Sequence, residues 1–511
     1  MSFKKYLLAR AMAFLAVFFV CNNCHAQKKR AVRFSHIYYV SNQGDDNNTG
    51  SLAAPFKTIQ KVNSLHLKPS SAIYFKGGDT FKGPLIIGQW DVGKVNPDSC
   101  IWISSYGDGQ AVVNGDSSRA ISLYRTDNVY IVNLKLVGLG RKNGNHENGM
   151  AILNSENIKV QFIDISGFQK SGLLIDSASN IHCTGVFAHD NGAAGITVEG
   201  DSKKASRNIY IENCRAENNP GDPTKLDNHS GNGIVVGHCT NVTIRDCSAT
   251  NNGWDMPRIG NGPVGIWCYE ADSVRIEYCL SYNNKTSKGG ADGGGFDLDG
   301  GTTNSVIEYC YSYGNQGSGY CIFQYWGASP FYNNIIRNNI SYNDGTVSDS
   351  QAGLYIWNSS GDPRQFYNCK VYNNIIYNSK VAAISFSEKS LNNGFDFYHN
   401  VFVGRDALMV GRDRLGKCRF TGNEWWSLES GFNIDGINSL QMWSAKTGKE
   451  RKNKKLTGMN IDPKFKNPDI SKLTDCNQMK TFTGFQFSKR SALKKRFGGD
   501  LAQTIPSNMI Y

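Results

Sequence analysis

Two aspartates separated by one residue are the strongest candidates for chemistry, in the segment Gly293-Gly294-Gly295-Phe296-Asp297-Leu298-Asp299-Gly300. Because side chains alternate between the faces of a strand, Asp297 and Asp299 would share one face, with Phe296 and Leu298 on the other. Two residues of rise would separate the aspartates by about 6.6–7 Å. The glycines allow a ligand to approach the backbone closely. Such a carboxylate pair can bind a cation or act in acid–base catalysis.

Two further acids, Glu270 and Asp292, lie close to this pair in the sequence. The oxygens of Asp292, Asp297 and Asp299 are hard ligands from a loop and a strand, a set that suits Ca²⁺. Alternatively, Asp297 and Asp299, or either one with Glu270 or Asp292, are the acid and base of a glycoside hydrolase. The estimated spacing lies near the lower limit for an inverting pair, about 6.5 Å. Both interpretations remain open.

The elements that position these acids belong to a repeat that runs from residue 100 to about residue 420. Short β-rich segments alternate with polar turns. One position of the repeat, here called the marker position, is occupied in successive coils by Cys214, Cys247, Cys279, Cys310, Asn339, Asn374 and Asn400, at intervals of 33, 32, 31, 29, 35 and 26 residues. This period predicts a coil of parallel strands in which each turn stacks on the next at about 4.8 Å. No single coil can bury its apolar face, so the stack itself must form the core.

The same register accounts for the cysteines. Four coils carry Cys at the marker position where later coils carry Asn, and Cys is a small core residue. We therefore expect stacked, reduced cysteines, with a disulfide framework as the alternative. Excluding Cys21 and Cys24 near the N-terminus, twelve cysteines are concerned.

Alignment of the coils also places aromatic residues beside the acidic pair. Trp267 and Tyr269 take the two Asp positions one coil earlier, and Phe323 takes the second position one coil later. Tyr355 and Trp357 follow in the next coil. Exposed rings beside carboxylates suit a sugar-binding groove, so we expect these five residues to bind substrate. The alternative is that loops cover them and the column forms a second small core.

The N-terminal segment carries a family resemblance. Residues 38–46 (YYVSNQGDD), 55–61 (PFKTIQK) and 77–81 (GGDTF) read as a strand, a short helix and a turn. This opening resembles that of secreted right-handed parallel β-helix proteins of the pectin-lyase-like type, among them polysaccharide lyases of family nine. The resemblance implies an all-β fold, a single-stranded right-handed parallel β-helix (solenoid) with a cap at each end.

The resemblance also has implications for the site. Family-nine lyases pair a calcium site of aspartates with a lysine base, which maps Asp297 and Asp299 onto metal ligands. Lys285 and Lys288, in the loop before the acidic strand, are the nearest candidates for the base, although no lysine lies on the strand itself. Because β-helix hydrolases of pectic sugars use aspartates on a strand wall, the resemblance does not exclude hydrolysis.

The two ends of the chain complete the domain prediction. Residues 1–26 read as a cleaved signal peptide, with basic residues before an apolar run that is too short to span a bilayer. We expect an N-terminal cap over residues 27–99, the β-helix over 100–420 and a loop-rich C-terminal cap over 421–511, covering the last coil. The protein is then secreted, periplasmic or at the cell surface, and lipid attachment at Cys21 or Cys24 stays open. No other long apolar stretch appears, so no transmembrane segment is expected.

The formal net charge of +12 favours anionic partners. The Lys and Arg residues are scattered, which does not indicate nucleic acid. We therefore expect a monomeric, exported enzyme that degrades an anionic, uronate-containing polysaccharide by β-elimination. The alternatives are a glycoside hydrolase and a non-catalytic carbohydrate-binding β-helix.

Overall fold

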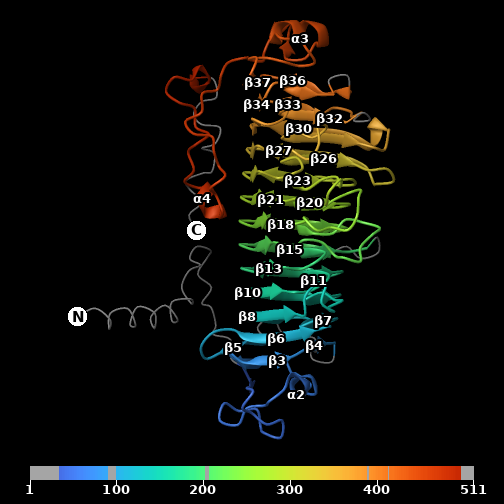
Figure 1. Ribbon diagram of the computed structural model, residues 1–511. Helices are drawn as coiled ribbons and strands as arrows, with labels where there is room; N and C mark the ends of the chain where they lie inside the picture. Colours follow the sequence, from blue (N-terminus) through green and yellow to red (C-terminus); the bar gives the residue numbers. More distant parts are fainter. Residues whose placement is uncertain (1–33, 90–98, 202–205, 388–390, 412–413, 496–511) are drawn as a thin grey trace, which may run out of the picture.

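The chain forms a tall stack of parallel strands, shown in the computed structural model of Figure 1. The structure describes residues 34–89, 99–201, 206–387, 391–411 and 414–495. The predicted signal peptide therefore lies outside the described residues. None of the helices in these ranges is long and apolar enough to cross a membrane.

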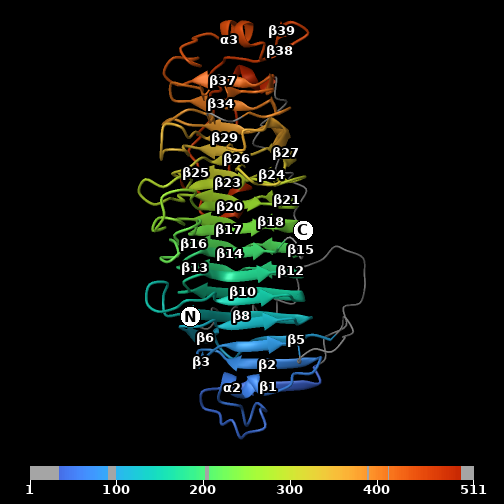
Figure 2. The same cartoon turned by 90° about the vertical axis from the view of Figure 1, so that its right-hand side faces the viewer.

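One face of the stack is a parallel sheet to which each coil adds one strand, so that successive strands lie above one another (Figure 2). In the described residues it has twelve strands, and it carries the acidic segment; below it is called the site sheet. Its strands are β4 (Leu85–Gly88), β7 (Ile121–Tyr124), β9 (Met150–Leu153), β11 (Ser171–Asp176), β14 (Ala194–Glu199), β17 (Asn232–Gly237), β20 (Val264–Tyr269), β23 (Gly294–Leu298), β26 (Tyr320–Gln324), β29 (Leu354–Asn358), β32 (Ile384–Phe386) and β35 (Met409–Val410).

The remaining faces form a second, continuous parallel sheet, to which most coils add a longer and a shorter strand. The described residues place 25 strands in it: β1 (His36–Val40), β2 (Ser71–Lys76), β3 (Thr80–Lys82), β5 (Ile101–Tyr106), β6 (Ala111–Asp116), β8 (Val129–Gly138), β10 (Glu156–Ser166), β12 (Ser179–Thr184), β13 (Phe187–His189), β15 (Ser206–Glu212), β16 (Arg215–Glu217), β18 (Cys239–Arg245), β19 (Ser248–Thr250), β21 (Asp272–Glu277), β22 (Leu280–Tyr282), β24 (Val306–Glu308), β25 (Tyr311–Tyr313), β27 (Phe331–Arg337), β28 (Ile340–Tyr342), β30 (Phe366–Tyr372), β31 (Ile375–Tyr377), β33 (Asp396–Tyr398), β34 (Val401–Gly404), β36 (Arg419–Thr421) and β37 (Glu424–Ser427).

This architecture is the predicted right-handed parallel β-helix, and its interior is one continuous apolar core. Alternate residues of each strand point inward, and residues in register stack along the axis. Phe296 of β23 stacks on Tyr320 of β26 with ring centroids 5.3 Å apart. The core is narrow at the start of the site strands, where a Cβ added to Gly295 would lie 2.3 Å from the Ser312 hydroxyl. A glycine is therefore required there.

The cysteine prediction is confirmed. All twelve described cysteines are free and buried. The Cys214 amide donates to the sulfur of Cys247 at 3.4 Å, and the Cys279 amide donates to that of Cys310 at 3.4 Å. The Cys310 amide in turn donates to the Asn339 side chain at 2.9 Å. Cys and Asn side chains thus both accept a hydrogen bond from the amide of the equivalent residue one coil earlier. The column continues through Asn374, Asn400 and Asn423.

A second asparagine column at another turn was not predicted. Each side-chain oxygen accepts a hydrogen bond from the amide of the equivalent residue one coil earlier, through Asn191, Asn219, Asn252, Asn284, Asn315 and Asp344. These ladders satisfy buried backbone groups at the corners of the coil. They hold the turns before the site strands rigid.

The described parallel pairings begin with β1, which pairs with β2, and end with β37, which pairs with β34. The predicted boundaries at residues 100 and 420 therefore fall inside the stack. The ends are covered by two short helices, α2 (Ile59–Asn63) and α3 (Leu440–Thr447). Trp443 of α3 is fully buried and lies 5.6 Å from the ring of Trp425 in the last coil.

Residues 461–495 do not cover the last coil, which corrects the expectation of a terminal cap over this part of the chain. This segment runs back down the side of the stack, as the red segment in Figure 1 shows. Its apolar side chains, including Phe485 and Phe487, pack on β22, β25, β28, β31 and β34. These strands carry apolar side chains such as Tyr313 at outward-facing positions, and the segment buries them. This segment contains α4 (Cys476–Met479) and the 3₁₀ turn η4 (Ala492–Lys495).

Three further short elements lie outside the two large sheets. They are the 3₁₀ turn η2 (Pro363–Gln365) and the two strands of a hairpin, β38 (Arg451–Lys452) and β39 (Lys455–Leu456).

Candidate active site

A pocket of 770 Å³ opens on the outer face of the site sheet, above β20, β23, β26 and β29. Its volume lies within the range of about 300–1,000 Å³ typical of small-ligand sites. Its lining residues are Asn228, His229, Arg258, Asn261, Gly262, Val264, Trp267, Tyr269, Gly289, Gly290, Ala291, Asp292, Asp297, Asp299, Phe323, Tyr325, Val347, Ser348, Ser350, Gln351, Tyr355 and Trp357.

The pocket owes its depth to unequal loops before the site strands. Three consecutive coils carry long loops there, over residues 218–231, 251–263 and 283–293. The next coil has only a short turn, residues 314–319, and the one after that again has a long loop, residues 343–353. The short turn leaves a gap above the acidic strand, with loop walls on both sides.

The long loops support one another through backbone hydrogen bonds. The Ala291 amide donates to the Gly260 carbonyl at 3.0 Å, and the Gly293 amide donates to the Pro263 carbonyl at 2.8 Å. The Gly262 amide donates to the Asp292 carboxylate at 2.6 Å. Asp292 itself has a φ of 61°, a left-handed conformation that is costly for a residue with a Cβ. The neighbouring loop thus holds a strained residue with its carboxylate in the pocket.

Asp297 lies at the floor, in register with Trp267 of the preceding coil and Cys321 of the next. These positions are those expected from the sequence. Only 2% of Asp297 is exposed, and its Oδ1 atom has no hydrogen-bond partner among the described residues. Burial, reinforced by the charges of Asp299 and Asp292, raises the pKa of Asp297 well above its ordinary value. Burial therefore favours the protonated form of the Asp297 carboxyl group.

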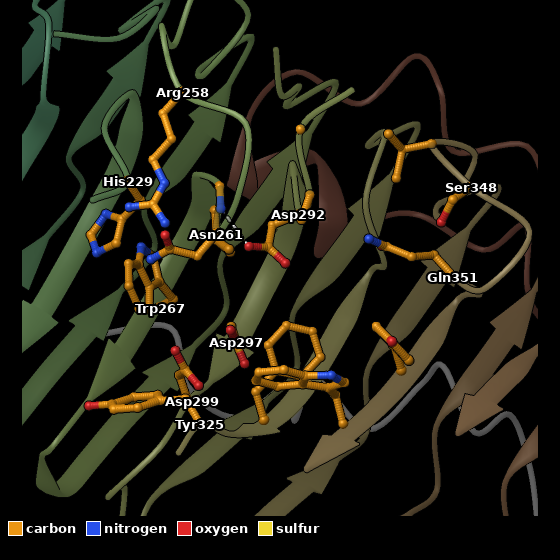
Figure 3. A pocket seen from close by; sticks show the side chains of 18 of the residues that line it. His229, Arg258, Asn261, Trp267, Asp292, Asp297, Asp299, Tyr325, Ser348 and Gln351 are labelled. Carbon is orange, nitrogen blue, oxygen red and sulfur yellow. Dashed lines mark hydrogen bonds between the residues drawn. The ribbon is translucent and has the colours of Figure 1, made fainter. Parts of the chain in front are cut away.

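Asp299 follows the end of β23 and accepts a hydrogen bond from the Gly300 amide at 2.7 Å. Burial raises its pKa to about 7; the amide opposes this rise, and the charges of Asp292 and Glu270 add to it. Burial likewise raises the pKa of Asp292 to about 6, against the effect of the Gly262 amide. Figure 3 shows Asp292 on the loop side of the pocket and Asp297 and Asp299 on the strand side. Carboxyl groups that titrate near neutral pH and face a common space are suited to proton transfer.

All five aromatic residues predicted to bind substrate line the pocket. The expectation that they are exposed is wrong for two of them, since Trp267 is 4% and Phe323 is 6% exposed. The Trp267 indole donates to Asn232 at 3.0 Å and packs in a small cluster with Ala194, Val235 and Val264. The loops cover this part of the column, which is the alternative that the sequence left open. The remaining three, Tyr269, Tyr355 and Trp357, are half-buried and can contact a ligand.

Glu270 is not among the residues that line the pocket. Its carboxylate accepts hydrogen bonds from the Tyr325 hydroxyl at 3.2 Å and the Ser329 amide at 2.8 Å. The side chain predicted to take part in catalysis instead holds the loop after β26. Through this bond it places the ring of Tyr325 at the pocket.

The two lysines predicted as bases also lie outside the pocket lining. Lys288 is exposed, and Lys285 is half-buried at the base of its loop, where its amide donates to the Asn252 carbonyl at 2.9 Å. The loop turns its glycines and Asp292 toward the pocket. The geometry therefore gives no support to a lysine base in this pocket.

A calcium site needs several oxygen ligands around one point. Within the described ranges, no group of three or more His, Cys, Asp or Glu side chains is close enough together to hold a metal ion. Asp292, Asp297 and Asp299 line one pocket but do not converge as a ligand set. The described side chains thus do not fit the expected site, and no step below involves a metal.

The sequence prediction missed Arg258 and Tyr325, which both line the pocket. Neither lies on a site strand: Arg258 belongs to the loop 251–263, and Tyr325 directly follows β26. The only available signal was the unequal length of the segments between the repeats. That signal indicates where loops project, but not which of their side chains turn inward.

Comparisons with known proteins identify relatives. A lacto-N-biosidase from Bifidobacterium longum subsp. longum is 27% identical over 206 residues, which are 40% of this chain and 12% of that protein. The match thus spans only a small part of that relative. A GH136 lacto-N-biosidase from Eubacterium ramulus has a TM-score of 0.51 at 16% identity, over 71% of this chain and 67% of that one. Pectate lyase Pel9A has a TM-score of 0.42 at 16% identity, over 70% of this chain and 82% of that one.

The family assignment rests on the match to a family model. Residues 38–350 match the model of the Pel9A-like right-handed β-helix region. This range is more than half of the chain and includes the acidic strand and the loops before it. The chain belongs to the family of Pel9A-like right-handed β-helix proteins.

Proposed function

We propose that this protein is a glycan-cleaving enzyme and that the pocket hydrolyses a glycosidic bond. The observation that carries this proposal is that Asp292, Asp297 and Asp299 line one pocket, with two of the three titrating near neutral pH. Half-buried aromatic rings beside them supply flat apolar surfaces for a sugar. The lacto-N-biosidase relative bears the name of a glycan-cleaving enzyme, which supports the same class.

The pKa values of the carboxyl groups decide which of them acts as the acid and which as the base. Asp299, whose pKa is raised to about 7, retains its proton in part of the molecules near neutral pH and can donate it to the leaving oxygen. Asp292, whose pKa is raised to about 6, is mostly ionised there and can accept a proton from the water that attacks the sugar carbon. The acid thus loses a proton to the leaving group while the base gains one from water.

Asp297 has a different part in this scheme. Its raised pKa favours the protonated form, which can donate a hydrogen bond from its hydroxyl or accept one at its carbonyl oxygen. Placed between Trp267 and Cys321 on the floor, it is suited to bind a sugar hydroxyl. We therefore assign proton transfer to Asp292 and Asp299, and substrate binding to Asp297.

β-Elimination on a uronate is the second candidate, and Arg258 is the observation that favours it. Elimination needs a cation beside the substrate carboxylate and a base for the neighbouring proton. Arg258 lines the pocket and can supply the cation. An ionised carboxylate of the same pocket can take the proton.

The products from a panel of neutral and acidic polysaccharides distinguish the candidates. Hydrolysis creates one reducing end per cleavage and no new double bond. Elimination also gives an unsaturated uronate that absorbs in the ultraviolet. The absence of any cleavage across the panel would indicate a binding protein instead.

Variants connect the activity to the pocket. Asp292→Asn and Asp299→Asn should each lower turnover at least about a hundredfold, the lower range for a positioned acid or base. Asp176→Asn is the matched control, because Asp176 lies at the end of β11 on the same sheet and does not line the pocket. Wild-type turnover in either of the first two variants would refute the assignment.

A further inference from the structure

Trp326 is a tryptophan whose ring the fold leaves in solvent. It is 81% exposed, and its indole has no hydrogen bond and no stacking partner among the described residues. Trp254, which is 43% exposed, differs, because its indole donates to Asn218 at 2.9 Å and the Arg141 guanidinium packs over its ring. Single exposed rings are common on protein surfaces, so the position and the support of this ring decide whether it indicates a site.

The position of Trp326 is beside the pocket, at its strand side. Trp326 directly follows Tyr325, whose side chain lines the pocket. A Cβ added to Gly300 would lie 2.6 Å from the Tyr325 ring, and Gly300 comes directly after Asp299. Figure 3 shows Asp299 and Tyr325 on this side. The exposed ring therefore continues the pocket outward from the end where Asp299 lies.

A tight turn over residues 325–328 carries the ring. The Ala328 amide donates to the Tyr325 carbonyl at 3.3 Å. Gly327 has a φ of 86°, close to the value that the third position of a type II turn requires and that glycine adopts without strain. Trp326 thus occupies the second position, at the tip of the turn. This geometry explains why the ring points away from the protein instead of packing on it.

The backbone of this turn is held on both sides. The Trp326 amide donates to the Ser359 hydroxyl at 2.9 Å, and the Ser359 amide donates to the Gln324 carbonyl at 2.8 Å. The buried Gln324 side chain donates to the Ser329 carbonyl at 2.9 Å, and the Ser329 amide donates to Glu270. An aromatic ring on a fixed backbone loses less conformational freedom when a ligand binds than one on a loose loop.

We propose that Trp326 is the stacking platform of an outer sugar subsite, so that the substrate is a glycan of at least two sugar units. One unit lies in the pocket, and the next lies on the indole beside Asp299. A flat apolar ring with an N–H at its edge suits the C–H face and the hydroxyls of a sugar. The inference rests on the proposed function, because it assumes that the pocket binds a sugar of the same chain. It adds the minimum length of the substrate, which the cleavage reaction by itself does not specify.

The test measures how binding depends on the length of the glycan. The probes are oligosaccharides of one to four units from cellulose, mannan, β-1,4-galactan and polygalacturonate. The parent protein is Asp299→Asn, which lacks the proposed acid so that the probes stay intact, and chromatography after each titration verifies this. Calorimetry compares the parent with Trp326→Ala, Trp326→Phe and the control Trp254→Ala, since Trp254 is an exposed tryptophan outside the pocket lining.

In at least one of the four series, the parent should bind members of two or more units about tenfold more tightly than the single sugar, the scale of one good aromatic contact. Trp326→Ala should remove this gain and leave binding of the single sugar unchanged. Trp326→Phe should retain part of the gain, and Trp254→Ala should retain all of it. Because the indole has no protein partner among the described residues, Trp326→Ala should also leave the melting temperature unchanged.

Two results would overturn the subsite: no gain of affinity with length in any of the four series, or a gain that survives in Trp326→Ala. The proposed hydrolysis can fail independently. If the wild type cleaves no glycan but the longer probes still require Trp326, the subsite stands and the reaction does not. If a polysaccharide is cleaved through Asp292 and Asp299 with the same kcat/KM in the wild type and in Trp326→Ala, only the subsite is wrong.

Discussion

The Asp292 carboxylate accepts a 2.6 Å hydrogen bond from the Gly262 amide, so a side chain of one loop is fixed by the backbone of the loop one coil earlier. This bond aims a carboxylate from above at the acidic strand below (Figure 3). A strand alone can place carboxylates only side by side on one face. The loop therefore turns a row of acids into a pocket with acids on two sides.

The first prediction concerns the pH dependence of turnover. Asp292 must be ionised, so activity should rise as the pH passes about 6; Asp299 must be protonated, so activity should fall as the pH passes about 7. The measured profile of kcat should be a narrow bell between these values. Because the charge of Glu270 contributes to the raised pKa of Asp299, Glu270→Gln should shift the alkaline limb to lower pH. A flat profile from pH 5 to 8 would exclude the assignment.

The second prediction concerns stability and Asp297. Its pKa is higher in the folded than in the unfolded state, so the folded protein binds the proton more tightly. This contribution to stability is present below the unfolded pKa and is lost as the pH rises through the folded pKa. Asp297→Asn keeps the shape without the ionisation, so its melting temperature relative to the wild type should rise from pH 5 to pH 9. A difference that is the same at both pH values would show that folding does not raise the pKa of Asp297.

The third prediction separates covered from accessible aromatic residues. Trp267→Ala removes a ring that is 4% exposed and should lower the free energy of unfolding by about 3–5 kcal/mol. Trp357→Ala removes a half-buried ring of the same pocket and should cost clearly less while weakening glycan binding. Denaturant unfolding and glycan titration of both variants provide the measurement. Equal losses of stability would contradict the different burial of the two residues.

The fourth prediction concerns the thiols. The twelve cysteines from Cys100 to Cys476 are free and buried, so a thiol reagent should react with few of them in the native protein and with all of them after denaturation. Burial raises the pKa of the Cys247 thiol, which further slows its reaction. Recovery of mostly oxidised cysteines from non-reducing denaturant would contradict the stacked column.

The sequence alone determined the coil and its register. Trp267, Asp297 and Cys321 lie side by side as predicted, because strand periodicity is two and each coil must stack on the last with its apolar face inward. The same constraint made the cysteines predictable, since a marker position keeps its place in every coil. The position of a residue within its coil recurs in every repeat, so it can be read from the repeat in the sequence.

Tertiary structure decided what the outward-facing residues do. Trp267 is buried among Ala194, Val235 and Val264 of the neighbouring strands, with the ring of His229 from the loop 218–231 against it. Asp292 enters the pocket because the Gly262 amide binds it. The paths of the loops depend on contacts between different coils, such as the hydrogen bond from the Ser287 hydroxyl to the Arg258 carbonyl. These paths leave Lys285 and Lys288 outside the pocket lining and place Arg258 within it. Those contacts have no period in the sequence. The strand positions of the acids could be derived from the chain, whereas their burial, and with it their pKa values, emerged only when the loops packed together.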